Sequence, residues 1–155
     1  MKVCTFAGHR RLAHDIEDEL RAQIHRAIAQ DGVQEFWCGA MGEFDRLCAR
    51  LVREAKAQHP HIRLMLVVPS VARAASAARH AYDDVLVPDV SDGAHPKQAI
   101  TLRNRWMAEH ADLLIAYVQR DHGGAYALTR WASKNKKPLR FIRENPEITQ
   151  RLLHL

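Results

Sequence analysis

Short apolar runs alternate with longer amphipathic stretches along the whole chain, and this alternation constrains the fold more than any other feature of the sequence. The apolar runs have the length of strands; they are Lys2–Ala7, Val33–Cys38, Ile62–Val68, Ala111–Val118 and Leu139–Ile142, with a minor run at Val85–Val87. Apolar residues at helical spacing predict helices over Asp15–Gln30, Glu43–Gln58, Val71–Ala81, Lys97–His110, from Gly123 and Gly124 to Lys134, and from Asn145 and Pro146 onward.

Strands that alternate with helices predict βαβ units, which form a parallel sheet through right-handed crossovers. The nearly unbroken apolar runs Leu64–Val68 and Leu113–Ala116 are typical of strands covered on both faces. A length of 155 residues fits one domain. We therefore expect an α/β fold: a single Rossmann-like domain over residues 1–155, with a mainly parallel central sheet and helices on both faces.

The composition narrows the class of protein but does not select a ligand. The hydrophobic fraction of 47% and the charged fraction of 26% are those of an ordinary globular protein, and the net charge of +5 favours anionic partners of any kind. Three cysteines without a CxxC spacing suit a reducing compartment. Met1 and Lys2 lead directly into the first apolar run, without a signal peptide or a transmembrane stretch. We expect a cytoplasmic protein with no membrane partner.

Three loops that contain glycine follow predicted strands directly; they are Gly8–Arg10, Gly39–Gly42 and the pair Gly123 and Gly124. In an open parallel sheet, ligands bind at the carboxyl ends of the strands near the topological switch point. The second and third loops also lead into helices, whose first N–H groups and dipole attract phosphate. Each loop alone fits a simple tight turn, but their convergence predicts a binding site. None is a complete GxGxxG motif or P-loop.

Polar residues near these loops are the candidates for the rest of the site. Arg10 suits two-point binding of a phosphate, and His9 suits proton transfer near neutral pH. Asn104 suits recognition of a base or hydroxyl, and Arg103 lies beside it on the same predicted helix. Each also has a plain alternative, a solvated loop or an ordinary helix surface.

Two carboxylates, Glu43 and Asp45, follow the second glycine loop. They are the candidates for catalysis, and Asp45 is also a candidate for binding ribose hydroxyls. The alternative is that both are first-turn acids that complement the helix dipole.

A basic run near the C-terminus comprises Arg130, Lys134, Lys136, Lys137, Arg140 and Arg143. It lacks the interleaved aromatic residues of single-strand binders, so a solvated face is the favoured interpretation and a nucleic-acid patch the alternative. No cluster of His and Cys has the spacing of metal ligands, so we expect no metal site.

Several segments together resemble the YpsA-like family of the SLOG (SMF/DprA and LOG) superfamily. Phe6–Arg10 resembles its TGHR motif, Gly39–Asp45 its GGAxGxD-type turn, and Arg103–Met107 with Ala111–Ala116 its RNxxM helix and following strand. Gly123 and Gly124 match its closing glycine pair. The resemblance runs in the family's order over roughly Lys2–Pro138.

The resemblance implies a Rossmann-like fold and a nucleotide-type ligand in a bacterial protein linked to stress response, and a homo-oligomer is common in the superfamily. LOG proteins are nucleotide phosphoribohydrolases with a PGGxGTxxE signature, and DprA proteins bind single-stranded DNA. In this chain Arg130 stands where the LOG signature has its catalytic glutamate. The resemblance therefore supplies no catalytic residue at that position.

The leading hypothesis is the binding or sensing of a nucleotide or nucleotide-derived phosphate ligand at the carboxyl edge of the sheet. Gly8, His9, Arg10, Gly39, Gly42, Asp45, Arg103, Asn104, Gly123 and Gly124 are its expected ligand-binding residues. The alternatives are an N-glycosidic hydrolase of the LOG kind and DprA-like binding of single-stranded DNA. Beyond the ligand itself, the sequence predicts no certain cofactor.

Overall fold

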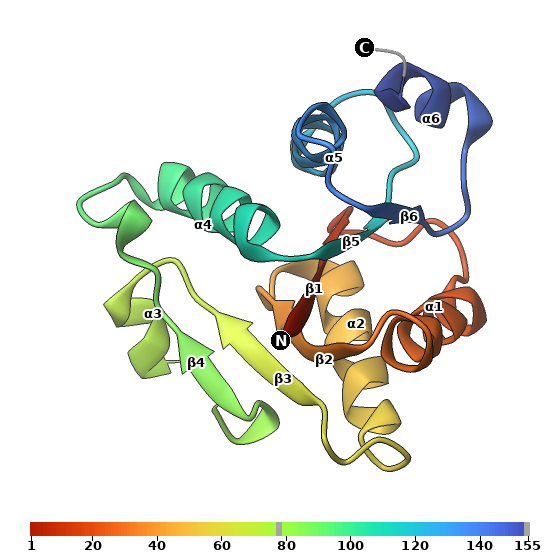
Figure 1. Cartoon of the computed structure of the whole chain (residues 1–155). Coiled ribbons are helices and arrows are strands. Elements are labelled where there is room, and N and C mark those ends of the chain that lie inside the picture. The colour runs from red at the N-terminus through yellow and green to blue at the C-terminus, as the bar shows by residue number, and fades with distance from the viewer. Residues whose placement is uncertain (77–78, 154–155) are drawn as a thin grey trace.

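The six strands of the chain form one sheet in which every neighbouring pair is parallel. A computed structural model describes residues 1–76 and 79–153 (Figure 1). The strands are β1 (Lys2–Gly8), β2 (Val33–Cys38), β3 (Arg63–Val67), β4 (Asp84–Leu86), β5 (Leu113–Tyr117) and β6 (Leu139–Phe141), in the order β4-β3-β2-β1-β5-β6.

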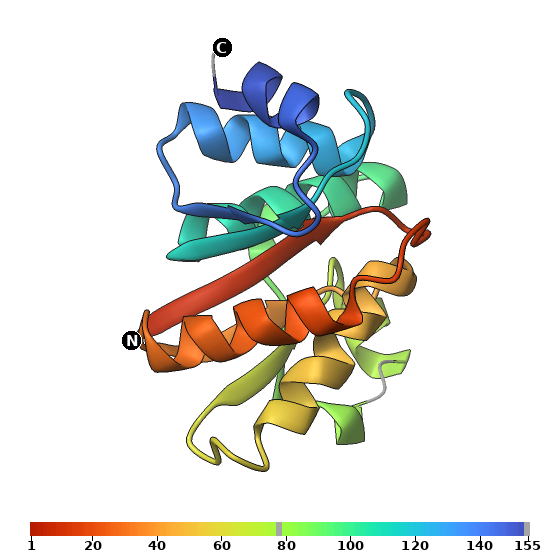
Figure 2. The same ribbon diagram turned by 90° about the vertical axis from the view of Figure 1, so that its right-hand side faces the viewer.

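The order of the strands places the switch point between β1 and β5. From β1 the chain moves outward to β2, β3 and β4, and it then crosses back to place β5 on the other side of β1. In Figure 2 the loop after β1 and the loop after β5 lie at the same end of the sheet. A parallel sheet of this kind opens a crevice at that point.

Helices cover both faces of the sheet. One face carries α1 (Glu17–Ala29) and α2 (Gly42–Ala55), whereas the other carries α4 (Pro96–His110), α5 (Gly124–Lys134) and α6 (Pro146–Leu153) (Figure 1). The short helix α3 (Val71–Ser76) and two 3-10 turns, η1 (Arg79–Ala81) and η2 (Asp89–Ser91), connect β3, β4 and α4. This arrangement confirms the predicted fold class.

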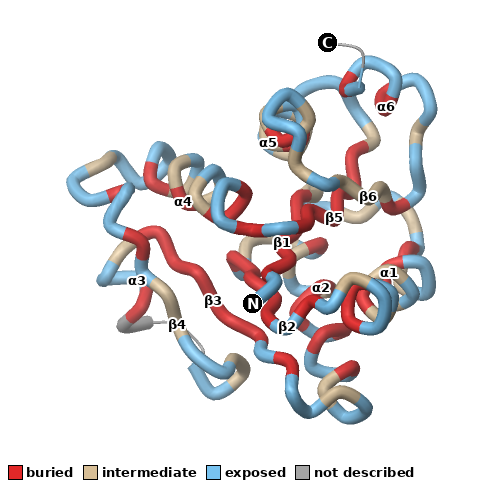
Figure 3. The backbone as a smooth tube through the Cα atoms, viewed as in Figure 1, coloured by how far each residue is buried: buried red, intermediate tan, exposed pale blue. Residues whose placement is uncertain are grey.

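The core follows the four inner strands, β1, β2, β3 and β5, whose residues are buried almost without interruption, whereas the edge strands β4 and β6 are only partly buried (Figure 3). Phe6, Phe36 and Ile115 face α1 and α2, while Ala116 and Val67 face the helices on the opposite side. Burial on both faces explains why these strands read as continuous apolar runs rather than alternating ones.

The predicted helix over Val71–Ala81 is the largest difference from the observed elements. The structure has α3 over Val71–Ser76 and the turn η1 over Arg79–Ala81, and residues 77 and 78 lie outside the described part. Alanine favours a helix at each position, but the chain here has to return to the sheet edge within a few residues to form β4. The other predicted elements match the observed ones with shifts at their ends.

All three cysteines, Cys4, Cys38 and Cys48, are free and buried. Burial raises the pKa of each thiol, so the thiolate form that reacts or binds metal is disfavoured. Among the described helices, none combines the length and the apolar content needed to cross a bilayer.

Candidate functional site

A cleft of about 580 Å³ opens at the carboxyl ends of β1 and β5, where the topology places the switch point. We call it the β1–β5 cleft. Four segments line it: the loop after β1, the start of α2, the first half of α4 and the loop that leads into α5. The lining includes Gly8, His9, Arg10, Arg11, Met41, Asp45, Lys97, Thr101, Asn104, Arg120, Gly124 and Ala125.

The lining of the β1–β5 cleft is strongly cationic. Arg10, Arg11, Lys97 and Arg120 line it, and Asp45 is the carboxylate among the described lining residues. The side chains of Arg10, Lys97 and Arg120 make no hydrogen bond or ion pair with any residue in the described part of the chain. Unpaired cations around one hollow create a positive potential that attracts an anion.

The N-terminus of α5 adds backbone donors to these cations. Gly123 caps the helix without a side-chain hydrogen bond, and its φ of 90° suits glycine. The N–H groups of Gly124 and Ala125, which line the cleft, have no acceptor within the helix. Apart from its chain neighbours and the backbone of its own helix, no described atom lies within 4 Å of a Cβ built on Gly124. This helix end is therefore open to a phosphate.

The N-terminus of α2, in contrast, is closed by the protein itself. The N–H of Glu43 donates to the carbonyl of Arg10 at 2.7 Å, and a Cβ on Gly42 would lie 2.7 Å from the Arg10 Cα. The N–H of Met41 donates to the Asp45 carboxylate at 3.2 Å. Gly42 thus allows the loop after β1 to pack on α2, and the N–H groups on either side of it already have acceptors. Binding of phosphate oxygens by Gly42 stays a prediction that this packing does not support.

Gly8 and Gly39 also serve packing. A Cβ on Gly8 would lie 2.1 Å from the Phe44 ring, and a Cβ on Gly39 would lie 2.9 Å from the guanidinium carbon of Arg103. Gly8 still lines the cleft. Gly39 instead lines a second, separate hollow, which shares Met41 with the cleft.

Arg103, which the sequence suggested as a ligand-binding residue, is buried and does not line the β1–β5 cleft. It is only 1% exposed, and its guanidinium donates to the Val67 carbonyl at 2.7 Å and to the Gly39 carbonyl at 3.4 Å. Its Nε donates to the Asn104 side-chain oxygen at 2.8 Å. Arg103 thus ties the ends of β2 and β3 to α4 and fixes the orientation of Asn104, which does line the cleft.

His9 joins the two loops at the switch point. The N–H of Gln119 donates to His9 Nε2 at 2.9 Å, so Nε2 is the unprotonated nitrogen and Nδ1 carries the hydrogen. Burial lowers the pKa of His9, and the nearby Arg120 and His122 lower it further. The neutral imidazole is therefore favoured near pH 7, and His9 holds the loops together as an acceptor.

This contact predicts a pH-dependent contribution of His9 to stability. Because the folded state lowers the pKa below the ordinary value of 6.5, the unfolded chain binds the proton more tightly. The contribution is complete above pH 6.5 and is lost as the pH falls through the lowered pKa. Urea unfolding between pH 5 and 8 should show a smaller loss of stability on acidification in His9→Gln than in the unchanged protein. The exposed His80→Gln serves as control, and identical pH profiles for His9→Gln and the unchanged protein would contradict the assignment.

The two carboxylates proposed for catalysis lie in different places. Glu43 accepts the N–H of Leu12 at 2.7 Å and lines the hollow beyond Met41, so it is not in the cleft. Asp45 lines the cleft, and burial raises the pKa of its carboxyl, while the Met41 N–H and Arg103 act in the opposite direction. The hydrolase alternative stays a prediction. Of the two carboxylates, only Asp45 lies where it could act on a ligand in the cleft.

The basic run near the C-terminus does not form a uniform cationic patch. Arg140 pairs with Asp31, with Nη2 2.5 Å from Oδ1, and Lys137 donates to the carbonyls of Glu109 and Ala111. Lys134 lies at the C-terminal end of α5, at the opposite end of that helix from the cleft. In residues 1–76 and 79–153, no group of three His, Cys, Asp or Glu side chains could hold a metal ion.

Three cations of the cleft, Arg11, Lys97 and Arg120, were not predicted from the sequence. Arg120 is three residues beyond the end of β5, as Arg10 is two beyond the end of β1. Lys97 lies in the first turn of α4. Applying the strand-end criterion to every basic residue would have found Arg120.

The fold is similar to those of two bacterial DNA-processing proteins. DNA processing protein A from Helicobacter pylori, described for its single-stranded DNA binding mode, matches with a TM-score of 0.68 at 18% identity, over 99% of this chain and 72% of that chain. DNA processing protein A (DprA) from Streptococcus pneumoniae matches with a TM-score of 0.68 at 15% identity, over 99% of this chain and 54% of that chain. No family model matches the sequence, and no curated protein matches it.

At these identities the likeness is one of fold. It is the Rossmann-like fold that the resemblance to the SLOG superfamily implies, whereas membership of the YpsA-like family stays a prediction. This chain spans about half of the S. pneumoniae protein, so the activity of that whole protein does not transfer to it.

Proposed function

We propose that the β1–β5 cleft binds the phosphate group of a nucleotide-type ligand. The observation that carries the proposal is the open N-terminus of α5 next to Arg10, Lys97 and Arg120, whose side chains make no hydrogen bond or ion pair with any described residue. Backbone N–H groups and guanidinium groups around one hollow are the donors that phosphate oxygens require.

The remaining lining suits the nucleoside part of such a ligand. Asn104, held by Arg103, offers both a donor and an acceptor to a base or hydroxyl, and Thr101 lies on the same helix. The volume of about 580 Å³ falls within the range of small-molecule sites.

Single-stranded DNA is the second candidate for the source of this phosphate. The fold likeness to a DNA processing protein that is described for binding single-stranded DNA favours it. Both candidates share the phosphate chemistry of the cleft, so binding experiments have to include both.

Thermal unfolding in low salt tests the proposal. At a ligand concentration of 100 times Kd, a ligand of the folded state stabilises it by about 2.7 kcal/mol, which raises Tm by roughly 5–10 °C for a chain of this size. We expect such a rise with nucleoside monophosphates or with oligothymidylate, and a smaller rise as salt increases. No rise with either ligand would contradict the proposal.

A further inference from the structure

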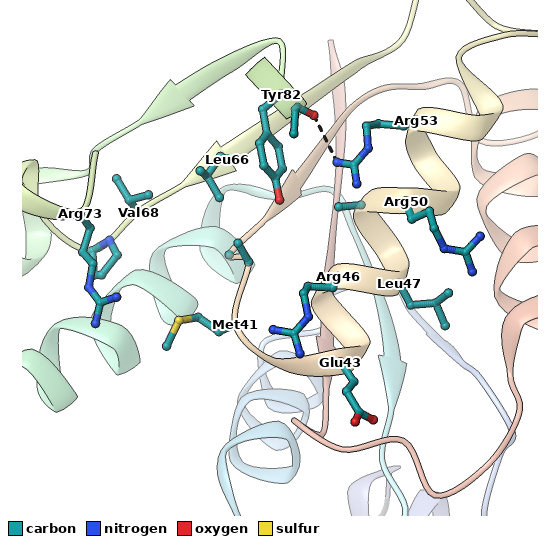
Figure 4. Close-up of a pocket in the computed structure, with 15 residues that line it drawn as sticks. Met41, Glu43, Arg46, Leu47, Arg50, Arg53, Leu66, Val68, Arg73 and Tyr82 are labelled. Carbon is teal, nitrogen blue, oxygen red and sulfur yellow. Dashed lines mark hydrogen bonds between the residues drawn. The ribbon is translucent and has the colours of Figure 1, made fainter. Parts of the chain in front are cut away.

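A second hollow, which we call the α2 groove, lies between α2 and the β3–β4 edge of the sheet (Figure 4). Its volume is about 670 Å³, and Leu47, Leu66 and Val68 give it an apolar lining. Its other lining residues include the arginines Arg46, Arg50, Arg53 and Arg73. The groove therefore combines apolar surface with positive charge.

The arginines from α2 differ in their internal contacts. Arg50 pairs with Glu17 of α1. Arg53 donates to the Ala81 carbonyl at 3.2 Å and lies over the Tyr82 ring, 5.7 Å from its centroid. Arg46 is exposed, and its side chain makes no hydrogen bond or ion pair within residues 1–76 and 79–153. Arg46 is thus available to an anion, and Arg53 and Tyr82 present planar groups on which a base can stack.

The α2 groove adjoins the β1–β5 cleft. Met41 lines both hollows, and the consecutive residues Asp45 and Arg46 line the cleft and the groove, respectively. In Figure 4 the side chains of Arg46 and Arg73 lie on either side of Met41. A mononucleotide would fill one of the two hollows, whereas a strand with a phosphate in the cleft would pass Met41 to reach the groove.

We propose that the α2 groove binds the continuation of a single-stranded nucleic acid whose first phosphate occupies the β1–β5 cleft. Its bases lie against Leu66, Val68 and Tyr82, and its phosphates meet Arg46 and the neighbouring arginines. This proposal rests on the proposed binding of phosphate by the cleft. It adds that the ligand is a single-stranded nucleic acid.

Binding of thymidine 5′-monophosphate and of an oligothymidylate of about ten nucleotides by the full chain separates the two sites. Arg46→Glu should weaken binding of the oligonucleotide about tenfold through the loss of a phosphate contact, while affinity for the monophosphate stays unchanged. Arg46→Gln should show a smaller loss in the same direction. Lys134→Glu makes the same charge change at an exposed position away from both hollows, and we expect it to alter neither affinity by more than about twofold.

Equal oligonucleotide affinity in Arg46→Glu and Lys134→Glu would overturn the proposal. So would monophosphate binding with no gain in affinity from the longer strand, a result that leaves the function of the cleft intact. If the unchanged protein binds neither ligand, the proposed function itself fails, and its extension fails with it.

Discussion

Replacing Arg10 and Arg120 together by glutamine is expected to weaken binding of nucleoside monophosphates about a hundredfold, since each charge-assisted hydrogen bond contributes about tenfold or more. Both guanidinium groups line the β1–β5 cleft, and neither has a hydrogen-bond or ion-pair partner in the described part of the protein. For the same reason the double variant should unfold at nearly the same temperature as the unchanged protein. Titration calorimetry in low salt measures the loss.

The double variant Arg130→Gln with Lys134→Gln provides a matched control. Both positions are exposed on α5 and neither lines the cleft, so the change in net charge is the same while the cleft stays intact. We expect the control to lose no more than about twofold in affinity at moderate salt, because exposed distant charges are screened. Equal losses in the two double variants would show that general charge, and not the cleft, attracts the ligand.

Replacing Arg103 by methionine is expected to lower the free energy of unfolding by roughly 2–4 kcal/mol. The methionine fills most of the volume but leaves the carbonyls of Val67 and Gly39 without this donor. Asn104 loses the contact that orients its amide, so ligand affinity should fall as well. Urea unfolding measures the first effect and calorimetry the second.

Arg105 offers the matched substitution on the same helix. It is exposed, and its guanidinium lies 4.8 Å from the centroid of the Trp131 ring. Arg105→Met should cost no more than about 1 kcal/mol, the scale of an exposed cation–π contact. If Arg103→Met is as stable as Arg105→Met, the buried guanidinium does not have the role assigned to it.

The inner strands were predictable because a strand that is buried on both faces has a continuous run of apolar residues. β2 and β5 are buried along nearly their whole length, and their apolar runs gave the correct positions. The strand order was not predictable, since β4 is a three-residue edge strand and the connection between β3 and α4 is irregular.

The site was only partly predictable, because glycines that pack and glycines that bind look the same in a sequence. Gly42 is the first residue of α2 and Gly123 directly precedes α5, and each glycine has a φ of 90°. Gly42 nevertheless packs against Arg10, whereas Gly123 leaves the end of its helix open. Arg103 belongs to the RNxxM motif, whereas Arg120 belongs to no motif. Of these two arginines, however, Arg120 lines the cleft and Arg103 does not. Only the fold separates these cases, through contacts between residues far apart in the chain.

Backbone amide shifts during titration with a nucleoside monophosphate test the central assignment most directly. In two-dimensional 1H–15N spectra, the amides of Gly124 and Ala125 at the open end of α5 should shift most, while the Glu43 amide, already bound to the Arg10 carbonyl, should shift little. Large shifts at Glu43 with none at Gly124 would move the phosphate to α2 and contradict the account.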